Sequence, residues 1–163
     1  MANKADYNTE ELEKLRDLIK DIDTAMLTTQ TEEGLVSRPM QTQEVEFDGD
    51  LWFFTKKDTD KYPEILHNQD VNVSYAGKSY VSIRGKAEIV EDIEKKKELW
   101  NKVYEKLLQT SYDDPNLVLI KVDVEAAEYW ETGSMVKNIV NLYNKMTGKG
   151  SDTKNLNETL ELD

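Results

Sequence analysis

Hydrophobic side chains recur at helical spacing in several stretches of the chain. An apolar stripe from Leu12 to Ile22, with Asn8 as its cap, predicts a first amphipathic helix. Similar spacing predicts one helix from Ile93 to Leu107 and a last helix from Ser134 to Tyr143. A shorter helix is expected from Tyr62 to Asn68, because a proline occupies its first turn, where the missing N–H costs little.

The remaining apolar positions follow strand-like patterns. Pro39 within one strand predicts a sheet edge, and Gly85 within another predicts a bulge or tight bend. Asp48-Gly49 is typical of a hairpin turn, and the fully apolar Leu51 to Phe54 predicts a central strand covered on both faces. The predicted strands cover residues 25–29, 35–40, 44–47, 51–54, 71–76, 80–90, 117–124 and 126–131.

Short strands interrupted by helices, rather than alternating with them, argue against a doubly wound parallel sheet. The pattern favours a mainly β fold with helices (α+β), built as a small antiparallel barrel. We expect one domain over residues 11–146, a disordered N-terminus over residues 1–10 and an acidic, polar tail over residues 147–163.

Composition excludes several classes of function. With 33 acidic and 21 basic residues the formal charge is −12, which argues against nucleic-acid binding. No cysteine is present, so disulfides, thiolate catalysis and Cys-based metal sites are excluded. We find neither an apolar run long enough to span a membrane nor a signal-like leader, and therefore expect a cytoplasmic protein without a membrane partner.

One group of basic residues stands out in this acidic chain. Arg38 lies on a strand whose expected neighbour ends at Thr55, followed by a loop with Lys56, Lys57 and Lys61. A hairpin would bring these ends together, and a guanidinium with ammonium and hydroxyl groups is suited to a phosphate. From spacing alone, a surface arginine beside a solvated lysine loop remains the alternative.

Other candidate residues give weaker signals. The aromatic run from Trp52 to Phe54 indicates core packing rather than ring stacking, whereas Trp130 is equally suited to closing a pocket or to packing. His67 is the only histidine and is expected to be a solvated helix residue. We find no catalytic triad, no metal site and no glycine-rich phosphate motif, so any nucleotide must be held by side chains and strand backbone.

The order of several motifs resembles one family of flavoproteins. SRPM at 37–40, LWFFT at 51–55, the loop reaching Lys61, PEILHNQDVNVSY, SIRGKAEIV and EYWE resemble the general stress protein branch of the pyridoxamine 5'-phosphate oxidase-like family. The resemblance covers residues 12–131. It implies the FMN-binding split barrel, a split antiparallel β-barrel with helices, usually a homodimer with two flavin sites at the interface.

The resemblance also implies a set of cofactor-binding residues. Arg38 and Lys61 would hold the FMN phosphate, while the segment Ser79 to Ser82 and Trp130 would approach the ring from the second subunit. The strand backbone lining the ring edge and ribityl chain would come from Pro39, Met40, Gln41, Phe54 and Thr55. The implied cofactor set is therefore Arg38, Pro39, Met40, Gln41, Phe54, Thr55, Lys61, Ser82 and Trp130, with no catalytic residue and no metal ligand assigned.

Departures from the family pattern bear on activity. The arginine- and serine-rich substrate segment is replaced by EDIEKKKELWNKVYEKLLQ, and neither arginine nor histidine follows Trp130, which argues against oxidation of pyridoxamine phosphate. The resemblance implies a flavin-dependent oxidoreductase with an unknown small-molecule electron donor. A non-catalytic protein that sequesters or senses flavin is the alternative. FAD and a deazaflavin remain alternatives to FMN, and haem is disfavoured by the single histidine.

Overall fold

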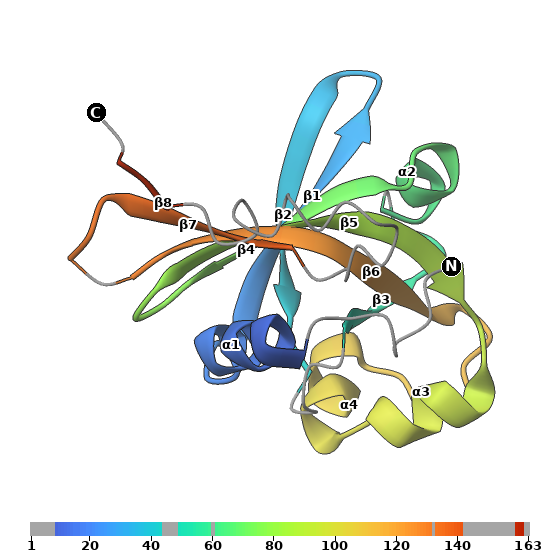
Figure 1. Ribbon diagram of the computed structural model, residues 1–163. Helices are drawn as coiled ribbons and strands as arrows, with labels where there is room; N and C mark the ends of the chain where they lie inside the picture. The colour runs from blue at the N-terminus through green and yellow to red at the C-terminus, as the bar shows by residue number, and fades with distance from the viewer. Residues whose placement is uncertain (1–8, 44–48, 60, 132, 142–158, 162–163) are drawn as a thin grey trace.

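The fold is dominated by one antiparallel sheet (Figure 1). The structure is a computed structural model that describes residues 9–43, 49–59, 61–131, 133–141 and 159–161. The strands are β1 (Thr24–Thr31), β2 (Gly34–Gln41), β3 (Asp50–Lys56), β4 (Asp70–Ala76), β5 (Tyr80–Val90), β6 (Leu117–Trp130), β7 (Val136–Asn141) and β8 (Thr159–Glu161). The helices are α1 (Thr9–Ile19), α2 (Lys61–His67), α3 (Ile93–Leu99) and α4 (Lys102–Leu108).

The strand order is β2-β1-β4-β5-β6-β7-β8, with β3 pairing separately to β6. The described sheet does not close on itself, in agreement with the predicted split barrel. Strand β2 ends this order, so the prediction that Pro39 marks an edge is confirmed. Strand β6 is long enough to pair with β5, β7 and β3, which makes it the strand that joins the two parts of the sheet.

The main core fills the concave side of the sheet, which α1 covers (Figure 1). Alternation along the strands places Leu27, Val73 and Ile83 on this side, and none of these side chains is exposed. Phe53 from β3 is also buried in the main core. A second cluster lies under α3 and α4 and consists of Phe54, Leu99, Tyr104, Leu117 and Leu119. Strand β3 therefore has both faces covered, as its apolar sequence predicts.

The sheet register confirms the predicted irregularity at Gly85. The pairing of β5 with β6 shifts between Arg84 and Gly85. A Cβ at Gly85 would lie 2.5 Å from the carbonyl oxygen of Asp123, a contact that no side chain tolerates. Glycine is therefore required here because two strand backbones approach closely.

The structure differs from the predicted elements at three places. Within the segment predicted as a last helix, Val136–Asn141 forms strand β7, because it pairs with β6. The strands predicted at 117–124 and 126–131 form the single strand β6. The helix predicted from Ile93 to Leu107 is broken into α3 and α4, since the Asn101 side chain accepts hydrogen bonds from the N–H groups of Val103 and Tyr104 and caps a new helix.

Some predictions fall outside the described residues. These residues include the Asn8 cap, the strand at 44–47 and Asp48 of the expected hairpin. Because the expected hairpin partner of β3 lies there, the prediction that β3 is central is not tested. Most of the predicted acidic tail lies there too, although Thr159–Glu161 forms β8 against β7. None of the described helices has the length and apolar character needed to cross a membrane.

Candidate functional site

A cavity of about 370 Å³ lies between the end of β2, strand β3 and helix α4. It collects Pro39, Met40 and Gln41 from β2 and Phe54 and Thr55 from β3. These segments come together because β2 contacts β3, while α4 packs its Tyr104 against Phe54 with ring centroids 4.8 Å apart. The predicted backbone-lining residues therefore share one cavity, which we call the β2–β3 cavity.

The same cavity contains residues outside the predicted cofactor set. They are Lys56, Thr59, Tyr104, Leu107, Leu108 and Gln109. Lys56 belongs to the recognised lysine loop, but nothing in the pattern distinguishes it from Lys57. The contribution of α4 is invisible in the sequence because it depends on contacts between segments about fifty residues apart.

Polar groups line the β2–β3 cavity at its β3 end. The buried Thr55 hydroxyl lies 3.1 Å from the hydroxyl of Thr59, which donates to the carbonyl oxygen of Lys56 at 2.8 Å. Lys56 is the one charged residue among the described lining residues. The neighbouring Lys57 does not line this cavity and pairs instead with Glu91 at 2.5 Å. The hydrogen bond with Glu91 raises the pKa of Lys57. Hydroxyl and ammonium groups of this kind suit an anionic or strongly polar ligand.

Arg38 lies on the other face of β2 from Pro39 and Gln41. Its Nη2 pairs with Oε2 of Glu64 on α2 at 2.8 Å, and it lines a different cavity of about 780 Å³. The exposed His67 borders this second cavity, as expected for a solvated helix residue. Lys61 begins α2, one turn before Glu64, but its side chain is not among those described.

Ser82 and Trp130 line a third cavity of about 330 Å³, together with Met26, Ser74 and Tyr80. Asn72 donates a hydrogen bond to the Ser82 hydroxyl at 2.9 Å. Nε1 of Trp130 is buried and has no hydrogen-bond partner among the described residues. A buried donor without a partner is costly, so this indole N–H marks a position where a ligand acceptor would be favourable.

Ser82 on β5 and Trp130 on β6 belong to strands that are not paired with β2. In the strand order, β1 and β4 lie between β2 and β5, and β6 follows β5. Pro39 and Met26 are nevertheless directly opposite each other on β2 and β1, so the β2–β3 cavity and the Trp130 cavity border one another along the sheet.

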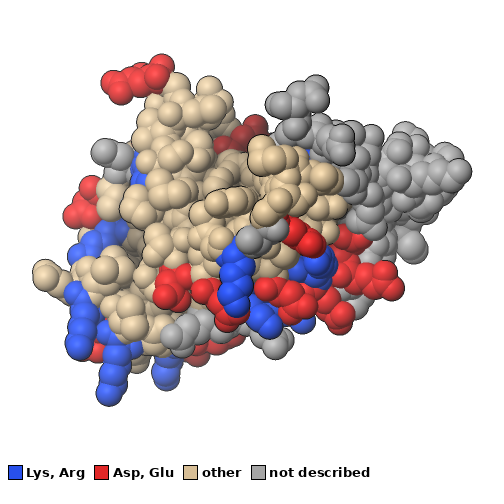
Figure 2. Space-filling model, turned by 90° about the vertical axis from the view of Figure 1, so that its left-hand side faces the viewer, with Lys and Arg blue, Asp and Glu red and all other residues tan. Residues whose placement is uncertain are grey.

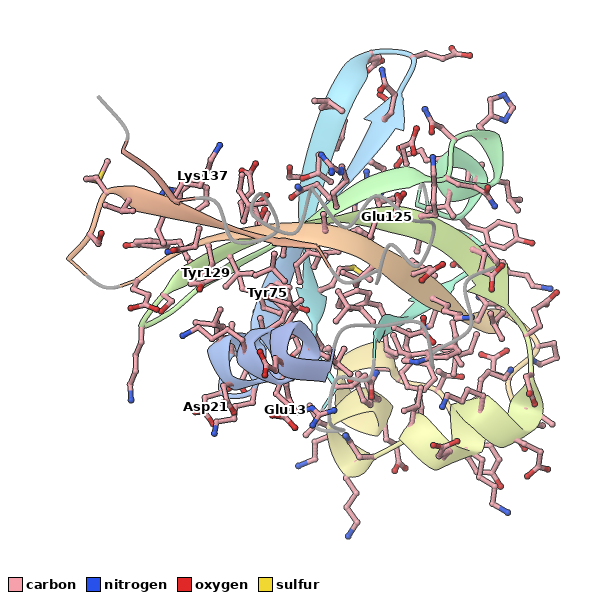
Figure 3. The ribbon with its side chains drawn as sticks, in the orientation of Figure 1. Glu13, Asp21, Tyr75, Glu125, Tyr129 and Lys137 are labelled. Carbon is pink, nitrogen blue, oxygen red and sulfur yellow. The ribbon has the colours of Figure 1, made fainter. Side chains whose placement is uncertain are left out.

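The two faces of the sheet differ in character. In Figure 3, Tyr75 and Tyr129 lie on the side that faces α1, whereas Lys137 lies on the opposite side. Burial raises the pKa of Tyr75, and burial is also the main cause of the raised pKa of Tyr129, which lies near Lys14. On the opposite side, Lys137 pairs with Glu128 at 3.6 Å.

Charges on the face drawn in Figure 2 are mixed. Acidic and basic side chains interleave along one side of this face, and its middle is uncharged. On this face the described basic side chains therefore lie among acidic ones. Among the described residues, no cluster of acidic or histidine side chains is arranged to hold a metal ion.

Comparison with known proteins identifies the family. The model of the family described as "Pyridoxamine 5'-phosphate oxidase like" matches residues 10–152. General stress protein 26 of Bacillus subtilis (strain 168) is 32% identical over 85 residues, covering 48% of this chain and 60% of that protein. The match therefore spans less than two thirds of that relative's length.

Solved structures agree with this assignment. General stress protein 26 from Bacillus anthracis str. Sterne has a TM-score of 0.64 and 28% identity, covering 72% of this chain and 92% of its own. The general stress FMN/FAD binding protein from Xanthomonas citri has a TM-score of 0.66 and 28% identity, covering 78% and 92%. The chain belongs to the pyridoxamine 5'-phosphate oxidase-like family.

Proposed function

We propose that this member of the pyridoxamine 5'-phosphate oxidase-like family binds FMN and uses it as an oxidoreductase. The proposed cofactor residues are Arg38, Pro39, Met40, Gln41, Phe54, Thr55, Lys61, Ser82 and Trp130. The observation that carries the proposal is the β2–β3 cavity, which gathers the β2 and β3 members of this set beside hydroxyl groups and Lys56. The description of the Xanthomonas citri structure as FMN/FAD binding is consistent with it.

The residues fit a flavin in their chemistry. The β2–β3 cavity offers the Gln41 amide, the Thr55 and Thr59 hydroxyls and the Lys56 ammonium to polar edges, and Tyr104 and Leu108 to an apolar ring. The unpaired indole N–H of Trp130 offers one more donor. Bound FMN would supply electron and hydride transfer, while these residues would bind and orient it.

A homodimer is part of the proposal. Ser82 and Trp130 line a cavity separate from the β2–β3 cavity, and the family resemblance implies that these positions approach the ring from a second subunit. Met26 and Tyr80 line the cavity that contains Ser82 and Trp130, and they are 40% and 59% exposed. A second subunit bound there would cover these side chains. Light scattering of the purified protein should give the mass of two chains.

A flavin-sequestering role is the second candidate. It is favoured by the absence of an evident acid or base among the described lining residues of the β2–β3 cavity, where Lys56 is the one ionisable group besides the buried Tyr104. The two roles differ in turnover. An oxidoreductase would oxidise a reduced nicotinamide or another small donor much faster than free FMN does, whereas a sequestering protein would not.

The binding proposal is tested by the double variant Arg38→Ala with Lys61→Ala. We expect it to lose FMN affinity by about a hundredfold or more, because both cations proposed to bind the phosphate are removed. Arg84→Ala with Lys86→Ala makes the same change of charge on β5, at residues that line none of the three cavities. Equal FMN affinity in both double variants would refute the proposed phosphate site. The visible spectrum of the bound ligand separates FMN or FAD from deazaflavin and haem.

A further inference from the structure

Arg38 shares a carboxylate with a buried threonine. Its Nη2 lies 2.8 Å from Oε2 of Glu64, and the hydroxyl of Thr29 donates to the same oxygen at 2.7 Å. Arg38 pairs across the hairpin with Leu27, and Thr29 is two residues further along β1. Alternate residues of a strand share a face, so Arg38 and Thr29 project toward α2 from the same side of the sheet.

The carboxylate of Glu64 is held in a rigid setting. Thr29 is fully buried on β1, which is paired to β2 on one side and to β4 on the other. Ile65, the next residue after Glu64, is 1% exposed and anchors α2 in the main core. Packing therefore fixes both α2, which carries Glu64, and β1, which carries Thr29. The carboxylate of Glu64 is held in place and in turn holds the guanidinium of Arg38.

The pair also changes the charge that Arg38 presents. The side chains of Arg38 and Glu64 are 17% and 18% exposed, so solvent screens them only partly, and together they carry no net charge. The contact of Nη2 with Glu64 fixes the plane of the guanidinium, which has further N–H donors for a ligand. Arg38 would thus give a phosphate oriented hydrogen bonds, while net positive charge would come from the lysine loop.

We propose that Glu64, held by Thr29, is a positioning residue that orients Arg38 toward the phosphate of the flavin. This inference rests on the proposed FMN binding. It assigns roles to two residues outside the expected cofactor set, both of which act through Arg38.

The sharpest test is Glu64→Gln in two backgrounds, with dissociation constants measured for FMN and riboflavin. With Arg38 present, Glu64→Gln should weaken FMN binding about tenfold and leave riboflavin binding within about twofold, because only FMN uses the guanidinium. In the Arg38→Ala background the same change should strengthen FMN binding several-fold, because it removes an unpaired carboxylate near the phosphate. The effect of one substitution reverses sign only if Glu64 acts through Arg38.

Glu88→Gln is the matched control. Glu88 on β5 pairs with Lys121 on β6 at 3.6 Å. Neither residue lines any of the three cavities described above. Like Glu64→Gln, the Glu88→Gln substitution removes one negative charge from an ion-paired glutamate. It should change FMN affinity by less than about twofold, with or without Arg38.

Thr29 provides a second test that keeps the charge. Thr29→Val removes the hydroxyl with little change of shape and should weaken FMN binding about threefold, whereas Thr29→Ser keeps the hydroxyl and should restore it. Circular dichroism and thermal unfolding verify that each variant is folded.

The outcomes separate the two proposals. A wild-type protein that binds neither FMN nor riboflavin would overturn both. A wild-type protein that prefers FMN, combined with a Glu64→Gln effect of the same sign and size in both backgrounds, would overturn the positioning role alone. Tighter FMN binding by Glu64→Gln with Arg38 present would also overturn it, since Glu64 would then oppose the phosphate.

Discussion

The hydroxyl of Tyr104 donates a hydrogen bond to the carbonyl oxygen of Thr42 at 3.0 Å. Tyr104 lies on α4, and Thr42 follows β2 directly, so this bond links the two sides of the β2–β3 cavity. Thr42 is itself fixed, because its hydroxyl donates to the carbonyl oxygen of Ile22 at 2.6 Å and its N–H donates to that of Asp23 at 2.8 Å. The width of the cavity therefore depends on a bond between segments distant in the sequence.

Loss of this bond should loosen the cavity. We expect Tyr104→Phe to lower the free energy of unfolding by about 1 kcal/mol and to weaken FMN binding several-fold, because the ring stays packed on Phe54 while the link is lost. Denaturant unfolding and flavin titration measure the two effects. Tyr112→Phe, which removes a phenol outside the cavity lining, serves as the control. Unchanged flavin affinity in Tyr104→Phe would show that α4 does not bound the flavin site.

Trp130 allows a test of ligand contact that is separate from stability. Because Nε1 of Trp130 has no partner in the described part of the chain, Trp130→Phe removes an unsatisfied donor and should change the unfolding free energy little. FMN affinity should fall several-fold if the flavin accepts this N–H. Trp52→Phe is the comparison, since Trp52 packs beside Lys95 away from the three cavities. Equal flavin affinities for the two variants would exclude Trp130 from the site.

Gly85 is expected to be intolerant of any side chain. Gly85→Ala should destabilise the fold by roughly 1–3 kcal/mol, because its Cβ would collide with the backbone of Asp123. Gly77→Ala introduces the same atom against the flexible side chain of Ile22 at 3.1 Å and should cost less. Urea unfolding of both variants measures the difference, and equal costs would contradict the close approach of β5 and β6.

Asp114 should make the fold sensitive to acid. A hydrogen bond from the Thr110 hydroxyl at 2.5 Å, followed by one from the backbone N–H of Asn116, lowers the pKa of Asp114. A lowered pKa in the folded state gives stability that is present above about pH 4 and is lost as the pH falls through the lowered value.

Thr110→Val and Asp114→Asn should both flatten the dependence of unfolding temperature on pH below about pH 4. Asp58→Asn, at an exposed loop residue, controls for the loss of one negative charge. If the unfolding temperature of Thr110→Val depends on pH in the same way as that of the wild type, the proposed role of the Thr110–Asp114 hydrogen bond would be contradicted.

Much of the fold follows from patterns within single elements. Proline at the edge strand, glycine at the bulge and the apolar run Leu51 to Phe54 in β3 each impose a local constraint that the structure confirms. The segment from Val136 to Tyr143 misleads because Val136, Ile139 and Val140 fit helical spacing, yet pairing along β6 determines the strand. The break at Asn101 is likewise local, but the apolar spacing around it hides the cap.

The site is less accessible to sequence analysis because it is assembled from distant segments. The β2 and β3 lining was predicted from the resemblance and lies in one cavity. Arg38 faces α2 instead, where Glu64 meets it, and no spacing rule relates residues 29, 38 and 64. The α4 wall depends in the same way on tertiary packing of Tyr104 against Phe54.

The central claim is a flavin site anchored by phosphate, and one titration tests it most directly. Purified wild-type protein is titrated with FMN and with riboflavin, which differ only in the phosphate, and binding is followed by flavin fluorescence. We expect FMN to bind about a hundredfold more tightly, equivalent to about 2.7 kcal/mol from charge-assisted hydrogen bonds. Equal affinities for the two ligands, or binding of neither, would contradict the claim.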